Sequence, residues 1–354
     1  MVSVGVHFFL IAILPHVLGR QEVPQEEPKL GHSAHARNIF RLDKTLRPGH
    51  GNVASVAWST RSNLVATGTN DGWLHLWDSR NLSEVFSERA VHTESKDGEF
   101  THPFALEALT FHPDRDDLLV TVGGAMLQSW IRGETWSPGS SADLGRSAWQ
   151  VVFRPRSDDV VVVTMGTIRY RDSRTCRLTE GSPKGGHGRW TALAFPPKEG
   201  RIATGGQHAS LSLWSGTVLD SEEVRLDGHT NWVTSVAYDR EGSRLATCSW
   251  DGSIRVYEPE RGRQVTVMGN GRSVYSTVAW SADSRWLLAG HWGGVVEVWD
   301  PASGDLADQL AVDDAFGPVM MAVAPGGEGL AVAMLGEAPL WIWRPSPPAA
   351  KNDK

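Results

Sequence analysis

The segment Ala66–Asp78, with the sequence ATGTNDGWLHLWD, decides the fold of this chain. It places the turn pair Asp71-Gly72 between two runs of alternating apolar residues, and it ends in Trp77-Asp78. Asp-Gly suits a tight turn between two strands, because aspartate tolerates the turn backbone and glycine readily adopts a positive φ. A similar segment, ATCSWDGSIRVYE, returns at Ala246–Glu258. The two segments predict the same hairpin at two places in one chain.

This hairpin belongs to a longer repeat, in which a marker residue stands at the end of one strand. The marker recurs about every 43 residues, after a longer first interval. In chain order the markers are Trp77, Trp130, Tyr170 or Arg171, Trp214, Tyr257, Trp299 and Trp343. Each unit supplies three alternating strands and leaves room for a fourth. Because so small a sheet cannot bury its apolar face alone, neighbouring units must stack.

Four-stranded units of this length are typical of propeller blades, and over residues 39–345 the chain resembles the WD40-repeat proteins. In that family a histidine between blades, a threonine or serine on the second strand, an aspartate in the next turn and a tryptophan on the third strand form a hydrogen-bonded relay. The resemblance implies this structural relay for His50, Thr67, Asp71 and Trp77. It implies a second relay for His229, Thr247 and Asp251, with Tyr257 in the tryptophan position. A third set comprises His187, Thr204 and Trp214, with His208 in place of the aspartate.

The other units depart from the relay pattern, and the second and third are the weakest matches. We count seven units, so the repeat and the resemblance predict an all-β, seven-bladed WD40-like propeller. After Trp343 the sequence RPSPPAAKNDK is too rich in proline to supply a fourth strand. Residues 38–46, NIFRLDKTL, alternate as a strand does. We therefore predict that this N-terminal strand completes the last blade and closes the ring.

Residues 1–19 are mostly apolar, and two interpretations involve the membrane. They are a secretory signal peptide, or an N-terminal anchor that tethers the chain through residues 2–18. No lysine or arginine precedes the apolar run, so a third interpretation is a cytoplasmic protein without a targeting signal. Export, to a secreted, periplasmic or membrane-anchored location, is favoured. We expect residues 20–38 to be a polar linker and residues 346–354 a flexible C-terminal tail.

Composition and motifs argue against several classes of function. The net charge of -7 lacks the basic footprint of a nucleic-acid partner. The two cysteines make no disulfide framework, and no cluster of histidine, cysteine or carboxylate has the spacing of a metal site. No GxSxG, P-loop, HExxH or GxGxxG motif is present in a suitable context. We expect no enzymatic activity and no cofactor.

In propellers of this family, the turn that carries the aspartate and the loop that carries the histidine lie on one rim, which usually receives partners. Tryptophan and arginine dominate binding hot spots, and this sequence places several of them there. The residues expected on a partner-binding rim are Trp73, Arg189, Trp190, His208, Trp232, Trp250, His291 and Trp292. Packing between blades is the alternative for these tryptophans.

The leading hypothesis is therefore a non-enzymatic scaffold that presents an aromatic-rich rim to a protein or peptide partner. The alternative is an exported propeller with a small-molecule, glycan or enzymatic site at the mouth of the central channel. An enzyme should show convergent polar groups with shifted pKa values in the channel. A scaffold should show an aromatic rim and a plain channel.

Overall fold

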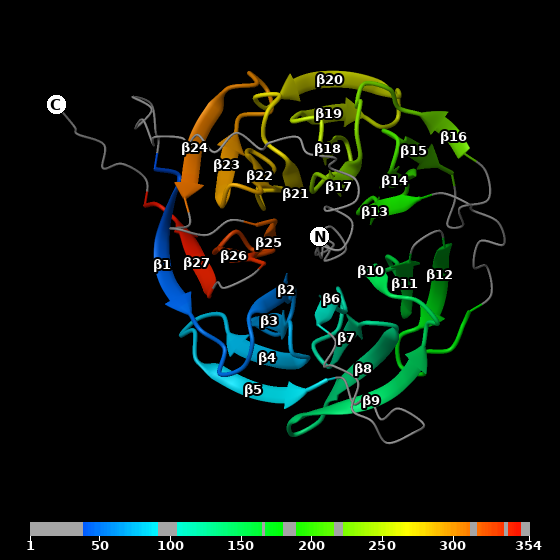
Figure 1. Cartoon of the computed structure of the whole chain (residues 1–354), viewed down its shortest axis with the longest axis vertical. Coiled ribbons are helices and arrows are strands. Elements are labelled where there is room, and N and C mark those ends of the chain that lie inside the picture. The colour runs from blue at the N-terminus through cyan, green and yellow to red at the C-terminus, as the bar shows by residue number, and fades with distance from the viewer. Residues whose placement is uncertain are drawn as a thin grey trace, which may run out of the picture.

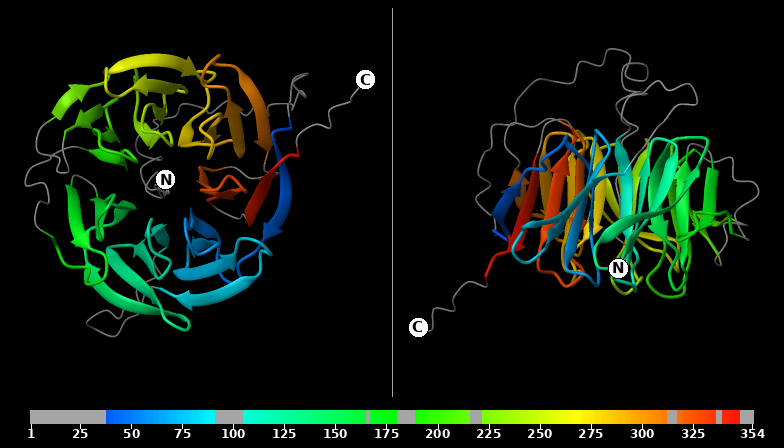
Figure 2. Two further views of the ribbon diagram at one scale, coloured as in Figure 1. Left: turned by 180° about the vertical axis from the view of Figure 1, so that it is seen from behind. Right: turned by 90° about the horizontal axis from the view of Figure 1, so that it is seen from below.

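The computed structural model describes residues 38–90, 105–164, 167–179, 189–215, 222–311, 317–335 and 339–347. Within these ranges every regular element is a strand, and the strands form seven small antiparallel sheets around a central axis (Figure 1). Seen from the side, the sheets stand next to one another in a flat disc (Figure 2). The prediction of an all-β, seven-bladed propeller is confirmed.

The strands follow the predicted repeat. Blade 1 comprises β2 (Val53–Trp58), β3 (Leu64–Thr69), β4 (Trp73–Asp78) and β5 (Glu84–Arg89), and blade 2 comprises β6 (Leu106–Phe111), β7 (Leu118–Gly123), β8 (Met126–Arg132) and β9 (Trp136–Asp143). Blade 3 comprises β10 (Ala148–Phe153), β11 (Asp159–Thr164) and β12 (Thr167–Asp172), and blade 4 comprises β13 (Trp190–Ala194), β14 (Ile202–Gly206), β15 (Leu211–Trp214) and β16 (Glu222–Arg225). Blade 5 comprises β17 (Val233–Tyr238), β18 (Leu245–Ser249), β19 (Ile254–Glu258) and β20 (Arg263–Met268). Blade 6 comprises β21 (Tyr275–Trp280), β22 (Leu287–His291), β23 (Val295–Trp299) and β24 (Leu306–Ala311). Blade 7 comprises β25 (Val319–Val323), β26 (Leu330–Met334), β27 (Leu340–Pro345) and β1 (Phe40–Leu46).

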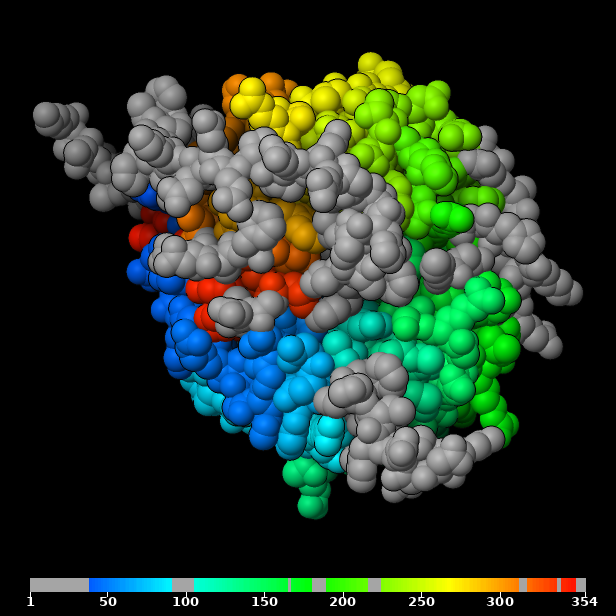
Figure 3. Space-filling view, viewed as in Figure 1, coloured from blue at the N-terminus to red at the C-terminus, as the bar shows by residue number. Residues whose placement is uncertain are grey.

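The ring closes as the sequence predicts, because β1 pairs with β27 and supplies the outer strand of blade 7. The pairing is antiparallel and sets Leu46 opposite Leu340 and Phe40 opposite Pro345. In the space-filling view the red segment near the end of the described chain lies directly against the blue segment near its start (Figure 3). A strand from near the start of the chain is thus hydrogen-bonded to a strand near its end, which locks the ring.

The core lies between the blades. The inner strands are buried on both faces, and each blade presents apolar side chains to its neighbour. At the junction of blades 7 and 1, Leu46, Trp58, Trp77, Leu340 and Ile342 belong to one buried cluster. Fully burying a large apolar side chain contributes about 1.5–3 kcal/mol, so stacking supplies most of the stability of such a ring.

Blade 3 is the least regular of the blades. Among the described residues it has three full strands, and its fourth position holds only a bridge between Arg171 and Leu178. Leu178 is 58% exposed. The sequence also marks this unit as a weak match, and the structure shows which part of the blade is short.

The two termini fall largely outside the described residues. Residues 1–37 carry the predicted signal peptide or anchor, so export stays a prediction, as do the limits of the linker and tail. Within the described part of the chain, no helix is long and apolar enough to span a membrane.

The inner strands carry a repeated bulge, and in blade 2 the bulge holds an acidic residue. In blades 5 and 6 the bulge residues are Thr234 and Ser276, whose hydroxyls donate to carbonyl oxygens of the next blade at 2.9 Å and 2.8 Å. In blade 2 the bulge residue is Glu107. Its Oε2 is buried and has no hydrogen-bond partner among the described residues. Burial raises the pKa of Glu107 to about 7.

Replacing Glu107 with glutamine is expected to stabilise the protein at pH 8 but not at pH 5. The folded state holds the Glu107 proton more tightly than the unfolded state between pH 4.5 and about 7. Stability is therefore lost as the pH rises through that interval, by about 3 kcal/mol. Urea unfolding of wild type and Glu107→Gln at both pH values measures the difference. Glu134→Gln, an exposed position in the same blade, is the control. An equal effect of Glu107→Gln at the two pH values would contradict the prediction.

Candidate functional site

Strand direction assigns the loops of the propeller to two faces. Successive strands of a blade are antiparallel, so the turn between the second and third strands lies on the same face as the loop that enters the first strand. We call this side the rim face; it carries residues 70–72 in blade 1 and 250–253 in blade 5. The opposite side, which carries the turns between the first and second strands, is the mouth face.

A backbone hydrogen bond repeats around the rim face and fixes its geometry. The amide of Trp250 donates to the carbonyl of Trp232 at 3.0 Å, and the amide of Trp292 donates to the carbonyl of Val274 at 3.1 Å. The same bond joins Gln207 to Arg189 in blade 4 and Asn70 to Asn52 in blade 1, each at 2.9 Å. Trp250 and Trp292 therefore occupy equivalent positions in adjacent blades, and Trp232 is held beside Trp250.

Trp232 and Trp250 form a stacked pair on the rim face of blade 5. Their ring centroids lie 4.7 Å apart and their planes differ by 9°. Both side chains are half-buried. The Nε1 atom of Trp250 is buried without a hydrogen-bond partner among the described residues, so packing rather than polar contact holds this indole. The pair presents a rigid aromatic surface that needs little ordering when a partner binds.

Blade 1 carries a column of stacked rings that leads from the rim face into the core. His50, which is exposed, stacks on Trp73 with centroids 3.7 Å apart and an interplanar angle of 6°. His75 follows at 6.3 Å from Trp73, and Trp77 lies 6.1 Å from His75. The buried His75 also pairs its Nδ1 with Glu84 Oε1 at 2.7 Å.

The other residues expected on the rim differ in accessibility. Arg189 and His208 are exposed, whereas Trp292 is half-buried. The Arg189 guanidinium donates to Gln207 Oε1 at 3.1 Å. Burial lowers the pKa of His291 to about 4, so this imidazole is neutral at pH 7. Its Nδ1 accepts a hydrogen bond from the Gly293 amide at 3.1 Å.

Trp190 does not contribute to the rim surface. It is the first residue of β13, only 6% exposed, and it packs edge-on against Trp214 with centroids 6.4 Å apart. This corrects its assignment to the partner-binding rim. An inner strand is covered on both sides by neighbouring blades, so its first residue is already inside the core.

The structure brings together three residues of the relay in blade 5. His229 Nδ1 lies 2.9 Å from Asp251 Oδ2, and His229 Nε2 lies 2.7 Å from Thr247 Oγ1. Tyr257 stands apart, because its hydroxyl donates to the Asp227 carbonyl at 3.1 Å. The imidazole is buried, and it joins the incoming loop to the second strand.

In blade 1 the structure joins only part of the expected set. Trp77 Nε1 donates to Thr67 Oγ1 at 3.1 Å, whereas Asp71 accepts from Thr69 Oγ1 at 2.6 Å. His50 stacks on Trp73 and makes no hydrogen bond with Thr67 or Asp71.

Blade 4 keeps a tryptophan–threonine bond, in which Trp214 Nε1 donates to Thr204 Oγ1 at 2.8 Å. His187 lies outside the described residues. Blade 2 has the same bond, which sequence reasoning missed: Trp130 Nε1 donates to Thr121 Oγ1 at 3.0 Å.

Blade 6 has a different buried network, also missed from the sequence. Glu297 Oε2 accepts from the Tyr275 hydroxyl at 2.6 Å and from Trp299 Nε1 at 3.1 Å. Desolvation raises the pKa of Glu297 despite these hydrogen bonds. The signal was present, since Glu297 interrupts the apolar run VVEVW two residues before the marker Trp299.

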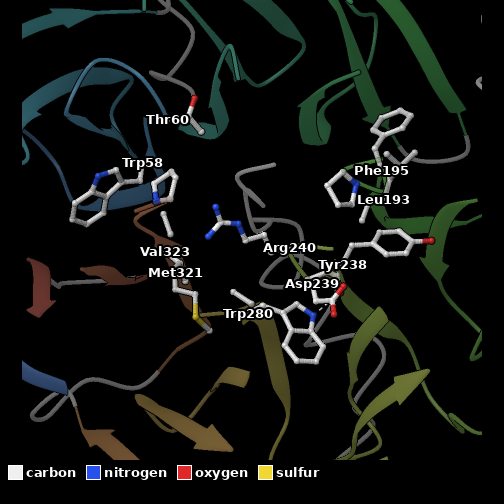
Figure 4. A pocket seen from close by; sticks show the side chains of 16 residues that line it. Trp58, Thr60, Leu193, Phe195, Tyr238, Asp239, Arg240, Trp280, Met321 and Val323 are labelled. Carbon is white, nitrogen blue, oxygen red and sulfur yellow. Dashed lines mark hydrogen bonds between the residues drawn. The ribbon is translucent and has the colours of Figure 1, made fainter. Parts of the chain in front are cut away.

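The mouth face has a pocket where the inner strands of five blades end (Figure 4). Its lining is mainly apolar and aromatic and includes Trp58, Phe195, Tyr238, Trp280, Met321 and Val323. Arg240 extends toward the middle of the mouth (Figure 4). Its guanidinium makes no hydrogen bond or ion pair with a described residue.

The other polar groups of this pocket are held by the protein itself. Asp239 Oδ2 accepts from Ser243 Oγ and Arg244 Nε, each at 2.9 Å. The Tyr238 hydroxyl donates to the Arg201 carbonyl, and burial raises the pKa of this tyrosine. Within the described part of the chain, no group of three histidine, cysteine or carboxylate side chains is arranged to hold a metal ion.

Comparison with known proteins matches the repeats directly. The family model of the WD domain, G-beta repeat, matches residues 41–78, 221–258 and 262–300. The first match begins in β1 and ends with β4, so it spans the closing strand and most of blade 1. The other two matches fall on blades 5 and 6 with the strands that precede them.

Curated relatives share these repeats at modest identity. WD repeat-containing protein 1 of Gallus gallus is 31% identical over 104 residues, which is 28% of this chain and 17% of that protein. Telomerase protein component 1 of Rattus norvegicus is 24% identical over 280 residues, 76% of this chain and 10% of that protein. The 66 kDa stress protein of Physarum polycephalum is 24% identical over 287 residues, 74% of this chain and 43% of that protein. The chain thus spans less than half the length of each of these relatives. The chain is thus a closed ring of seven blades that carries WD40 repeats at three places.

Proposed function

We propose that this propeller is a non-enzymatic scaffold that binds a protein or peptide partner on the rim face of blades 4 to 6. WD40 propellers generally serve as protein-interaction scaffolds. The observation that carries the proposal is the stacked, half-buried pair of Trp232 and Trp250, with Trp292 at the equivalent position of the next blade. Large rigid aromatic side chains of this kind dominate the energy of protein interfaces.

The channel mouth supports the same proposal over the competing one. An enzymatic site needs titratable groups that converge on one point with separated pKa values. At this mouth Asp239 is neutralised by Arg244, and Tyr238 is bonded to the backbone. Only Arg240 is free among the charged residues that line the pocket, and a single guanidinium is not an acid–base pair.

Replacing Trp232 or Trp250 with alanine is expected to weaken partner binding at least about tenfold while changing the melting temperature by only a few degrees. Each indole is half-buried, stacks on the other and belongs to none of the buried core clusters, so its removal should leave the blade core intact. The full-length wild-type chain is used to capture partners from its source cells. A candidate partner is a protein that the wild type enriches and Trp232→Ala does not. This partner is then purified, and calorimetry measures its Kd for the wild type and for each variant.

The control variant is Val85→Ala, which removes an exposed apolar side chain from β5, away from the rim face. It should bind the partner as the wild type does. If wild type, Trp232→Ala and Trp250→Ala bind the partner with equal affinity, the rim face is not the binding surface. A large fall in melting temperature for either tryptophan variant would show instead that the pair is structural.

A further inference from the structure

Blade 3 replaces the marker tryptophan with an arginine. In β12, Arg171 lies opposite Val160, the same register in which Trp77 lies opposite Val65 and Trp130 opposite Leu119. The buried residues Ile168 and Tyr170 of the same strand belong to the cluster shared with blade 4. By alternation, Arg171 points the other way, toward blade 2.

The arginine lacks the acceptor that the tryptophans have. In blades 1, 2 and 4 the indole donates to a threonine on the second strand. This threonine lies two residues after the residue that pairs with the tryptophan, as Thr204 lies two residues after Ile202 in blade 4. In blade 3 that position is Val162, whose side chain accepts nothing. The Arg171 Nη1 donates to the Cys176 carbonyl at 2.7 Å, but Nε is buried with no hydrogen-bond partner among the described residues.

Arg171 also lines a cleft between β9 of blade 2 and the turn that follows β12. The other lining residues are Ser140, Ser141, Ala142, Thr175, Cys176 and Arg177. Neither Arg171 nor Arg177 makes an ion pair with a described carboxylate, whereas nearby Arg174 pairs with Asp117 at 3.0 Å. The residues that line the cleft therefore include two arginines and no carboxylate.

The neighbouring acids are engaged elsewhere. Asp172 Oδ1 accepts from the Thr175 amide and hydroxyl, each at 2.7 Å, and from the Arg174 amide at 3.1 Å. Asp143 Oδ1 accepts from the Gly145 amide at 2.7 Å. Burial lowers the pKa of Arg171, and the attractions of Cys176 and Asp143 oppose this only in part. A partly buried guanidinium without an ion-pair partner is unfavourable, and an external anion would relieve that cost.

We propose that the cleft between blades 2 and 3 binds a phosphate-class oxyanion, held by Arg171 and Arg177 with a hydroxyl donor from Ser140. A guanidinium offers a fork of donors that matches the oxygens of phosphate, and charge-assisted bonds of this kind are short and strong. The site lies away from the rim face, so it is independent of the scaffold proposal.

The test is a titration of the full-length chain with inorganic phosphate, against sodium chloride of matched ionic strength. The wild type should bind phosphate by calorimetry and gain melting temperature. Arg171→Met and Arg177→Ala should each weaken binding about tenfold or more, because each removes a charge-assisted contact. Arg177 is exposed, so its variant tests the site even if Arg171→Met disturbs the blade. Arg80→Met, an exposed arginine in blade 1, should bind phosphate as the wild type does.

A second arm uses a phosphoserine peptide and its unphosphorylated form, and distinguishes a protein-borne phosphate from the free ion. Binding of the phosphopeptide that Arg171→Met abolishes would identify a phosphorylated partner segment. Phosphate binding without peptide binding would identify a free-anion site. Absence of phosphate binding, or equal binding by wild type and both arginine variants, would overturn the proposal.

Discussion

Replacing Leu46 with aspartate is expected to lower the free energy of unfolding by about 4 kcal/mol, because it removes a buried side chain and places a charge in the core. Leu46 is 4% exposed and lies in the cluster that joins blade 7 to blade 1. The residue is the last of β1, directly opposite Leu340. Urea unfolding at pH 7 measures the loss.

The effect should reach beyond one side chain, because β1 closes the ring. Its ladder with β27 joins the two ends of the described chain within one sheet. When that strand is weakened, blade 7 can open locally before the rest of the ring unfolds. Hydrogen exchange of the β27 amides should therefore speed up more in Leu46→Asp than exchange of the amides in β18, on the other side of the ring.

Leu42→Asp is the matched control, with the same substitution in the same strand. Leu42 lies opposite Trp343 but is 47% exposed, so its carboxylate would stay in water. It should change the free energy of unfolding by no more than about 0.5 kcal/mol. Similar losses for the two variants would mean that the Leu46 effect does not come from burial at the seam.

The propeller itself is predictable from sequence because its signals are local. Alternation within each strand and the Asp71-Gly72 turn act over a few residues, and the regular spacing of the marker residues repeats these local signals along the chain. Ring closure could be predicted by counting strands: the proline-rich end after Trp343 cannot add one, and residues 38–46 can. Neither inference needs knowledge of which side chains meet across the ring.

The contacts of His50 in blade 1 could not be predicted from such local signals. His50 and His229 precede comparable strands, yet His229 bonds to Asp251 and His50 stacks on a ring. The difference follows from the residue after the turn glycine. In blade 5 this is Ser253, whose hydroxyl lies 2.6 Å from Asp251 and 3.2 Å from His229. In blade 1 it is Trp73, which offers a flat indole and no matching hydroxyl.

The candidate surfaces were only partly predictable for a similar reason. The turn positions of Trp250 and Trp292 follow from the repeat, but the stacking of Trp232 on Trp250 depends on how the incoming loop is held. The burial of Trp190 depends on where β13 begins. Glu297 could have been found, since alternation puts it on the same face as Trp299 in a buried strand.

Removal of the buried Asp251 carboxylate in blade 5 is expected to have the second large effect on the free energy of unfolding. Asp251→Ala should lower the free energy of unfolding at pH 7 by about 3 kcal/mol, because it leaves the buried His229 and two backbone amides without their acceptor. The carboxylate accepts from the Thr230 amide at 2.9 Å and the Ser253 amide at 2.8 Å, besides its contact with His229. Its side chain is only 6% exposed. Asp71→Ala, at the equivalent turn of blade 1, should cost about 1 kcal/mol, because Asp71 accepts one side-chain bond and lacks the histidine.

The loss at Asp251 should also depend on pH, with a definite sign. Burial alone would raise the pKa of Asp251, but hydrogen bonds from His229 and Ser253 outweigh it and hold the pKa well below its ordinary value of 3.8. A carboxyl group with a depressed folded pKa stabilises the protein fully above its unfolded pKa, and this contribution is lost as the pH falls toward the folded value. The gap between wild type and Asp251→Ala should be widest at neutral pH and should narrow steadily below about pH 4. A gap that stayed constant from pH 7 to pH 3 would show that the ionised carboxylate contributes nothing, and that Asp251 acts only through the shape of its turn.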